Sequence, residues 1–215
     1  MKKTRIVIVD DHPIVRQGLS QLLGTESDFD VIGEASDAGG AMDLVEQHHP
    51  DLVIVDISLK DISGMELIKQ IRARDDKIKI LVSSMHDEKL YAERCLHAGA
   101  MGYISKEEAT NNLVGAIRQI LNGKVYLSPD MSEHFLSRMV KVGPEADRPS
   151  IATLSDRELE VFELIGRGMT TRKIASVLNL SMKTIETYRE NIKIKLGLAN
   201  STELIRRAVQ WSETR

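Results

Sequence analysis

The first 121 residues repeat one pattern five times: a short apolar run, then a longer segment with the apolar spacing of a helix. We expect strands at 4–9, 30–35, 51–56, 79–83 and 102–105, and helices near 13–23, 38–48, 64–73, 87–98 and 107–121. Glycine or proline stands just after four of the five expected helix ends, as Gly24, Pro50, Gly99 and Gly123. Repeated strand–helix units pack as a parallel sheet with helices on both faces. The sequence therefore predicts an α/β domain.

A different architecture follows. Ser128 and Pro129 suit the start of a short helix over 128–140, and residues 141–152, rich in Gly, Pro and charge, read as a linker. Ser155 and Glu158 then form a capping box, and helices follow to about 166 and over about 171–178, 182–196 and 201–212. Two helices joined by a short turn match a helix-turn-helix. We expect three parts: 1–124, 125–152 and 153–215.

Charge divides unevenly between the parts. Residues 1–150 hold 18 basic and 24 acidic side chains, for a net charge of −6, whereas residues 151–215 hold 11 and 8, for +3. The two parts are therefore expected to bind different partners. No apolar run reaches the roughly 18 residues of a membrane span, so we expect no membrane partner. Cys95 is the single cysteine, which fits a cytoplasmic location.

Polar side chains stand at the ends of four expected strands. Asp10 and Asp11 follow the first strand, Asp56 the third, Ser84 the fourth and Lys106 the fifth. Ligands of open α/β sheets bind at this edge. The carboxylates can hold Mg²⁺, Asp56 can accept a phosphoryl group, and Lys106 and Ser84 can stabilise its oxygens. Alternatives are a structural Asp–Lys network and an aspartyl phosphohydrolase, although the latter prefers Asp-x-Asp where this chain has adjacent acids.

The residues at this edge, together with Gly64 and Tyr103, resemble the receiver domain of two-component response regulators. The resemblance implies a flavodoxin-like (βα)5 domain with sheet order 2-1-3-4-5. It also implies Asp56 as phosphoacceptor, a sensor histidine kinase as donor, and magnesium held by Asp10, Asp11, Asp56 and the Ser58 carbonyl. Ser84 and Tyr103 would be the switch residues, although Tyr103 can also be an ordinary aromatic at the sheet. The chain would catalyse only its own phosphorylation and dephosphorylation.

Residues 154–200 resemble the LuxR-type helix-turn-helix of the NarL/FixJ subfamily, through Leu154–Glu158, Gly168, Ile174-Ala175, Leu180-Ser181, Lys183–Ile185, Ile192 and Lys195–Gly197. Helical spacing places Ile185, Tyr188, Ile192 and Leu196 on the core face of helix 182–196. The expected DNA contacts comprise candidates for base edges, Lys183, Thr184, Glu186, Thr187 and Glu190, and candidates for phosphates, Arg172, Lys173, Arg189, Lys193 and Lys195. Glu186 and Glu190 can instead be solvated or paired with nearby basic side chains.

The last helix carries Leu204, Ile205, Ala208 and Val209, part of which must complete the small core. By resemblance, the rest forms a dimer contact, and double-stranded DNA and RNA polymerase are expected partners. The leading hypothesis is a transcription factor that dimerises and binds DNA when Asp56 is phosphorylated. The alternative is a receiver that works without phosphorylation, as a protein-interaction module fused to DNA-binding helices.

Overall fold

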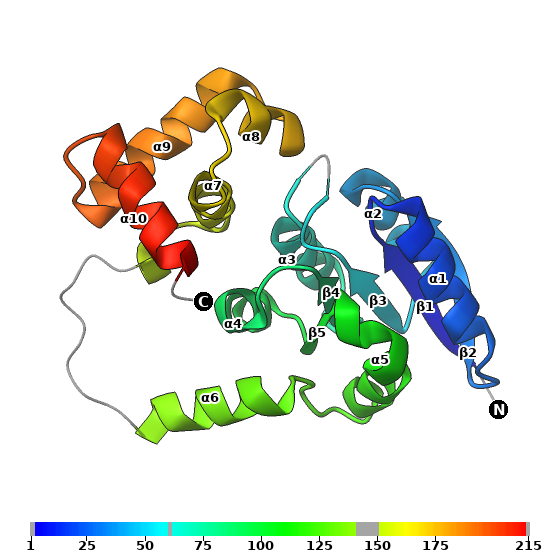
Figure 1. Cartoon of the computed structure of the whole chain (residues 1–215). Helices are drawn as coiled ribbons and strands as arrows, with labels where there is room; N and C mark the ends of the chain where they lie inside the picture. The colour runs from blue at the N-terminus through cyan, green and yellow to red at the C-terminus, as the bar shows by residue number, and fades with distance from the viewer. Residues whose placement is uncertain (1–2, 60–61, 141–150, 214–215) are drawn as a thin grey trace. The chain divides into compact units, whose positions relative to one another are not determined.

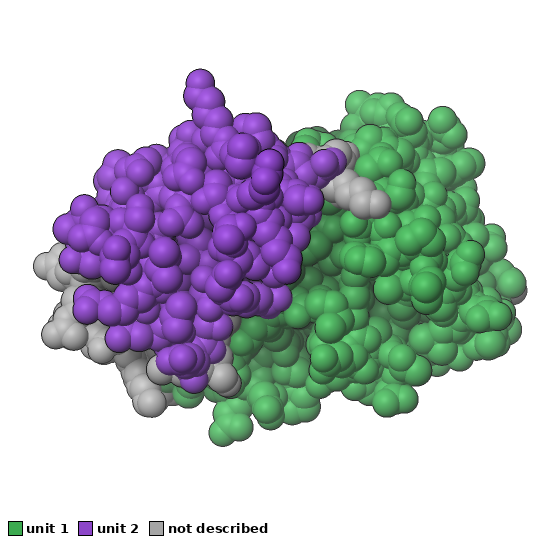
Figure 2. Space-filling view, turned by 45° about the horizontal axis from the view of Figure 1, so that its top comes forward, with its two compact units in different colours: residues 1–142 green, residues 143–215 purple. Residues whose placement is uncertain are grey.

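A computed structural model of the chain describes residues 3–59, 62–140 and 151–213. It divides into two compact units, residues 1–142 and 143–215, which are coloured separately in Figure 2. All of the named strands belong to the first unit. Most of the linker expected at 141–152 lies outside the described residues. Within the described part of the chain, no helix is long and apolar enough to cross a membrane.

The first unit contains a five-stranded parallel sheet of order β2-β1-β3-β4-β5, which confirms the expected fold (Figure 1). The strands are β1 (Thr4–Val9), β2 (Phe29–Ala35), β3 (Leu52–Val55), β4 (Lys79–Ser84) and β5 (Gly102–Ser105). Every side chain of β3 is buried, as are the last four of β1. These unbroken apolar runs form central strands because helices cover both of their faces.

Five helices alternate with the strands, and they keep the strand ends at one edge of the sheet. They are α1 (Pro13–Gly24), α2 (Ala38–His48), α3 (Gly64–Arg74), α4 (Glu88–Ala98) and α5 (Lys106–Leu121). Leu19 and Leu23 of α1 share a core with Leu113 and Ile117 of α5 on one face of the sheet. Helix α2 contacts α3, and α3 contacts α4, on the other face.

The segment after α5 is bound to the edge of the sheet. The Tyr126 amide donates to the Met101 carbonyl, and the Tyr103 amide donates to the Tyr126 carbonyl, each at 3.0 Å. Ser128 then begins helix α6 (Pro129–Val140), and its amide donates to Glu88 Oε1 at 2.9 Å. The short helix expected at 128–140 is therefore present, but as part of the first unit.

The second unit is entirely helical in its described part. After the 3-10 turn η1 (Ile151–Thr153) come α7 (Asp156–Gly166), α8 (Thr171–Val177), α9 (Met182–Leu196) and α10 (Ser201–Glu213). The expected capping box is formed, since the Ser155 and Glu158 side chains each bond to the other's main-chain amide. Helix α7 ends at Gly166, where a β-carbon would lie 2.6 Å from the Ala208 carbonyl oxygen, so glycine lets α7 and α10 approach closely.

Candidate functional site

The edge of the sheet gathers the polar side chains that the sequence places at its strand ends. Asp10 and Asp56 follow β1 and β3, and the Asp56 amide donates to the Val9 carbonyl at 2.8 Å, so the two ends are held side by side. Asp10, Asp56 and Ser84 are all at most 2% exposed. Carboxylates are rarely buried to this extent unless a cation or donor faces them.

Lys106 is the cation that faces these carboxylates. As the first residue of α5, it places Nζ 2.7 Å from Asp10 Oδ2 and 2.7 Å from Asp56 Oδ2. Burial works to lower the pKa of Lys106, but the two carboxylates outweigh it and raise that pKa, so the ammonium stays charged. Burial is also the main influence on Asp56 and raises its pKa, against the opposing effect of Lys106.

Two carboxylate oxygens remain available to a further cation. Among the described residues, Asp56 Oδ1 and Asp11 Oδ1 are buried and have no hydrogen-bond partner. Oxygens of this kind are what Mg²⁺ and similar ions bind in proteins. The residues present therefore fit a divalent cation beside Asp56, on the side that Lys106 leaves free.

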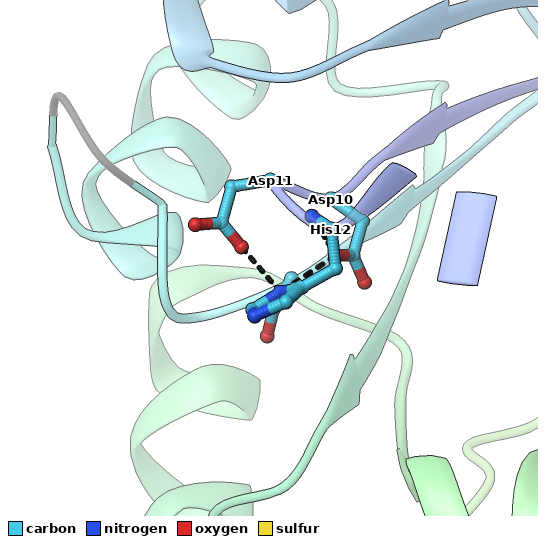
Figure 3. A group of neighbouring side chains, drawn as sticks. Asp10, Asp11 and His12 are labelled. Carbon is cyan, nitrogen blue, oxygen red and sulfur yellow. Dashed lines mark hydrogen bonds and ion pairs between the residues drawn. The ribbon is translucent and has the colours of Figure 1, made fainter. Parts of the chain in front are cut away.

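His12, which is not among the residues expected at this edge from the sequence, also joins this group. Its Nδ1 lies 2.6 Å from Asp11 Oδ1 and 3.3 Å from Asp10 Oδ1 (Figure 3). One ligand atom from each of Asp10, Asp11, His12 and Asp56 lies within 4.8 Å of the others. The sequence could have indicated His12 because it directly follows the acidic pair Asp10 and Asp11. Residues that follow a central strand lie at the edge of the sheet where that strand ends.

Gly64 holds the loop after Asp56 against the site. Its amide donates to the Ile57 carbonyl at 2.8 Å, and a β-carbon there would overlap the Asp56 carbonyl oxygen and lie 2.8 Å from Ile57 Cα. These are main-chain atoms that cannot rotate away. Glycine is therefore needed so that α3 can begin this close to Asp56.

The loop after β4 connects Ser84 with the remaining site residues. Ser84 Oγ accepts from the His86 amide at 3.2 Å, and Ser58 Oγ lies 2.9 Å from His86 Nε2. Tyr103 is fully buried and its hydroxyl donates to the His86 carbonyl at 2.7 Å. Burial is the main reason that the pKa of Tyr103 is raised, so the phenol stays protonated. Tyr103 is thus directed inward, toward the loop that carries Ser84.

Helix α9 presents an exposed face in the second unit. Lys183, Glu186, Thr187 and Glu190 are exposed there, whereas Thr184 is half-buried and its amide donates to Ser181 Oγ at 3.0 Å as part of the helix cap. Glu186 accepts from the Thr171 hydroxyl at 2.8 Å, and Glu190 Oε1 lies 2.9 Å from Lys193 Nζ. Glu186 and Glu190 therefore both have partners within the unit, which agrees with the alternative that they pair with nearby side chains rather than meet base edges.

Three of the expected phosphate contacts form ion pairs within the second unit. Arg189 is buried at 9% exposure, on the same helix face as Ile185 and Ile192, and its Nε lies 3.8 Å from Glu186 Oε2. The Lys193 side chain is 15% exposed and paired with Glu190. Lys195 Nζ lies 2.6 Å from Glu158 Oε2, the carboxylate of the capping box. The pairs of Arg189 and Lys193 lie within α9, whereas the pair of Lys195 joins α9 to α7. Arg172 and Lys173 on α8 are exposed.

The expected dimer residues of α10 also divide. Leu204 and Ala208 are fully buried where α10 packs against α7 and α9, so they belong to the part that completes the small core and leave no surface for a dimer contact. Ile205 is 45% exposed and Val209 is half-buried. Of these four residues, only Ile205 and Val209 have exposed surface that a second copy of the chain could contact.

Comparisons with known proteins divide the chain in the same way. The family model of the response regulator receiver domain matches residues 6–118, and that of bacterial regulatory proteins of the luxR family matches residues 152–208. The chain is 35% identical to the oxygen regulatory protein NreC of Staphylococcus carnosus, covering 96% of this chain and 97% of that protein. It is also 35% identical to the transcriptional regulatory protein UhpA of Escherichia coli, covering 94% and 96% respectively.

Solved structures resemble the chain over nearly its full length. RcsB from Salmonella enterica serovar Typhimurium, bound to promoter rprA in the presence of the phosphomimetic BeF3-, is 26% identical with a TM-score of 0.63. That match covers 95% of this chain and 98% of the RcsB chain. RcsB has also been solved as two dimers bound to two parallel DNAs.

Proposed function

The chain belongs to the NarL/FixJ family of response regulators, with a receiver domain and a LuxR-type DNA-binding domain, and from this premise we propose that phosphorylation of Asp56 controls its binding to DNA. The observation that carries the proposal is the unpartnered, buried Oδ1 of Asp56 beside the Lys106 ammonium. A sensor histidine kinase supplies the phosphoryl group, and the chain catalyses no reaction beyond gaining and losing it. As a DNA-binding protein it works in the cytoplasm, with RNA polymerase as a further partner.

The residues around Asp56 divide the chemistry between them. Asp56 attacks phosphorus and takes the phosphoryl group from the donor, whose leaving group departs on the opposite side. Asp10, Asp11, Asp56 and the Ser58 carbonyl would hold Mg²⁺, and the ion would offset the negative charge of the phosphoryl oxygens. Lys106 stays positive and faces one of these oxygens, and the Ser84 hydroxyl donates to another.

The loop after β4 carries the change outward. Phosphorylation adds about −1.5 to −2 charge at Asp56. When the Ser84 hydroxyl turns to this charge, the loop that carries His86 follows, and Tyr103, which donates to the His86 carbonyl, adjusts with it. The rearranged receiver then favours a dimer, in which two copies of α9 reach two half-sites of DNA. In support, RcsB is described both as DNA-bound dimers and with a phosphomimetic.

A labelling experiment tests the first step. The full chain is incubated with acetyl phosphate and Mg²⁺, and the phosphoprotein is resolved by mass spectrometry before and after hydroxylamine, which cleaves acyl phosphates. We expect one phosphoryl group on the wild type and on the control variant Asp43→Asn, which changes an exposed carboxylate of α2, and none on Asp56→Asn. Labelling that persists in Asp56→Asn contradicts the assignment.

A second measurement separates the proposal from its alternative. DNA affinity and oligomeric state are compared with and without beryllofluoride, which mimics the phosphoryl group. Tighter binding and dimerisation that disappear in Asp56→Asn support control by phosphorylation. Equal affinity for wild type and Asp56→Asn under both conditions supports a receiver that acts as an interaction module without phosphorylation.

A further inference from the structure

The imidazole of His12 lies at the acidic site in a position that its sequence neighbours do not explain. His12 precedes α1 as its N-cap residue, but its side chain makes no capping hydrogen bond. Its main-chain amide donates to Asp10 Oδ1 at 2.8 Å, which fixes the residue at the site while the ring remains 63% exposed. The ring therefore serves neither the helix nor the core.

The contact between His12 and Asp11 has the distance of a strong hydrogen bond but not its geometry. Nδ1 lies 2.6 Å from Asp11 Oδ1, yet this oxygen has no hydrogen-bond partner among the described residues. A hydrogen bond needs the N–H directed at the oxygen, with an angle well above about 120°. When the ring is neutral, a cation that binds both Nδ1 and Asp11 Oδ1 accounts for two such atoms lying this close without a hydrogen bond between them.

The spacing of the donor atoms suits one ion. Ligands at right angles on an ion with bonds of about 2.1 Å lie about 3.0 Å apart. His12 Nδ1 is 2.6 Å from Asp11 Oδ1, with which it would share the ion, and 3.3 Å from Asp10 Oδ1 beside it, and these two distances bracket about 3.0 Å. Asp56 Oδ1, which is buried and has no hydrogen-bond partner among the described residues, is an independent observation that points to a cation at this site.

We propose that His12 supplies an imidazole nitrogen to the ion held by Asp11 and Asp56, so that this site takes a first-row transition-metal ion such as Mn²⁺ in preference to Mg²⁺. The reason is chemical: Mg²⁺ selects oxygen ligands and retains its water, whereas imidazole nitrogen suits transition metals. The proposal rests on the phosphoacceptor function above, because it concerns the ion of that site. It adds the class of ion and the residue that selects it.

The test measures binding of the metal alone to the full-length protein at one fixed pH. Dissociation constants for Mn²⁺ and Mg²⁺ are obtained by calorimetry for the wild type, His12→Asn, His12→Ala and the control His97→Asn, which changes an exposed histidine of α4. We expect the preference for Mn²⁺ over Mg²⁺ to fall about tenfold or more in both His12 variants, because even residues behind the ligands of a metal alter affinity 10–100-fold. His97→Asn should keep the wild-type preference.

A spectroscopic experiment shows whether the imidazole nitrogen of His12 binds the metal ion directly. Electron spin echo spectra of the Mn²⁺ complex should contain the ¹⁴N modulation of a coordinated imidazole in the wild type, and should lose it in His12→Ala. Unchanged preference, or a wild-type spectrum without this modulation, overturns the proposal. An equal loss of both ions also overturns it, because His12 would then only position Asp11.

Failure of this proposal and failure of the phosphoacceptor function remain distinguishable. If Mg²⁺ binds and Asp56 is labelled by acetyl phosphate, but the His12 variants keep the wild-type ion preference, only the role of His12 is refuted. If neither ion binds the wild type, the metal site itself is refuted and the ion preference with it. Melting temperatures without metal show that the variants are folded, which the exposure of His12 leads us to expect.

Discussion

Replacement of Lys195 by methionine should destabilise the DNA-binding unit rather than weaken its contact with DNA phosphates. Lys195 Nζ lies 2.6 Å from Glu158 Oε2, and the two side chains are 39% and 5% exposed. Loss of one partner costs about 3–5 kcal/mol in a buried pair and about 0–1 kcal/mol in an exposed one. With one buried partner here, we expect a loss of about 1–2 kcal/mol.

The assay follows urea or thermal unfolding through Trp211, the chain's single tryptophan, whose ring lies 5.4 Å from that of Phe162 in the same unit. A loss of about 1–2 kcal/mol corresponds to a Tm lower by roughly 4–16 °C for a domain of this size. The control Lys183→Met, at an exposed position of α9, should change stability by less than about 0.5 kcal/mol.

The salt dependence of DNA binding shows whether Lys195 contacts a DNA phosphate instead. Each lost phosphate contact lowers the slope of log affinity against log salt by about 0.9. Lys195→Met should keep the wild-type slope. If its slope falls by about 0.9 while Tm stays unchanged, Lys195 is a phosphate contact and the structural argument is refuted.

The same pair predicts an acid sensitivity. Burial works to raise the pKa of Glu158, but the hydrogen bonds from Lys195 and Ser155 outweigh it and lower that pKa. A lowered pKa in the folded state adds stability above the ordinary pKa of a glutamate, and this stability is lost as the pH falls through the lowered value. Lys195→Met should therefore show a weaker loss of stability at acidic pH than the wild type.

Three further predictions concern the receiver. Gly64→Ala should destabilise it by about 1–3 kcal/mol and slow labelling by acetyl phosphate, measured by circular dichroism and mass spectrometry, because the new β-carbon overlaps the Asp56 main chain; wild-type values for both would contradict this. Since burial raises the pKa of Asp56, metal-free Asp56→Asn should be more stable than the wild type at neutral pH, and the difference should shrink as the pH falls through the raised pKa; a difference that grows instead would show the opposite shift. Ser58→Ala removes the hydrogen bond that joins the loop after β3 to the loop after β4, so the phosphoryl group should become more accessible to water and decay about 2–10-fold faster, as measured by mass spectrometry over time; an equal or longer lifetime would refute a protective role for this bond.

The sheet could be predicted from the sequence because burial leaves its strands little choice. Val53 to Val55 and Ile6 to Val9 are apolar at every position, and only central strands of a parallel sheet bury both faces. Once the strands are ordered, the position of Asp10, Asp56 and Lys106 at one edge follows from topology alone. The direction of the His12 ring does not, because it depends on the main-chain turn between β1 and α1.

The burial of Arg189 on α9 could not be predicted from its charge. At about 100° per residue, Arg189 lies about 40° from Ile185 on the helix and Tyr188 about 60° from it, so spacing favours Arg189 for the buried face. The positive charge of Arg189 instead suggested that its side chain would be exposed. The structure buries Arg189 and leaves Tyr188 half-buried, and a partner for the buried guanidinium, Glu186, stands one turn earlier. Exposure of a charged residue depends on its available partners, which linear sequence does not display.

The segment after α5 is bonded both to β5 and to the start of α4, so a change in either element reaches it. The Tyr103 amide donates to Tyr126, so the strand that carries the buried tyrosine also holds the segment. Glu88, four residues after Ser84, accepts from the Ser128 amide at the start of α6. A movement of the Ser84 loop that displaces Tyr103 or Glu88 must therefore break one of these hydrogen bonds or move the segment with it. Physical coupling requires an element that both sites bias, and this segment is bound to both β5 and the start of α4.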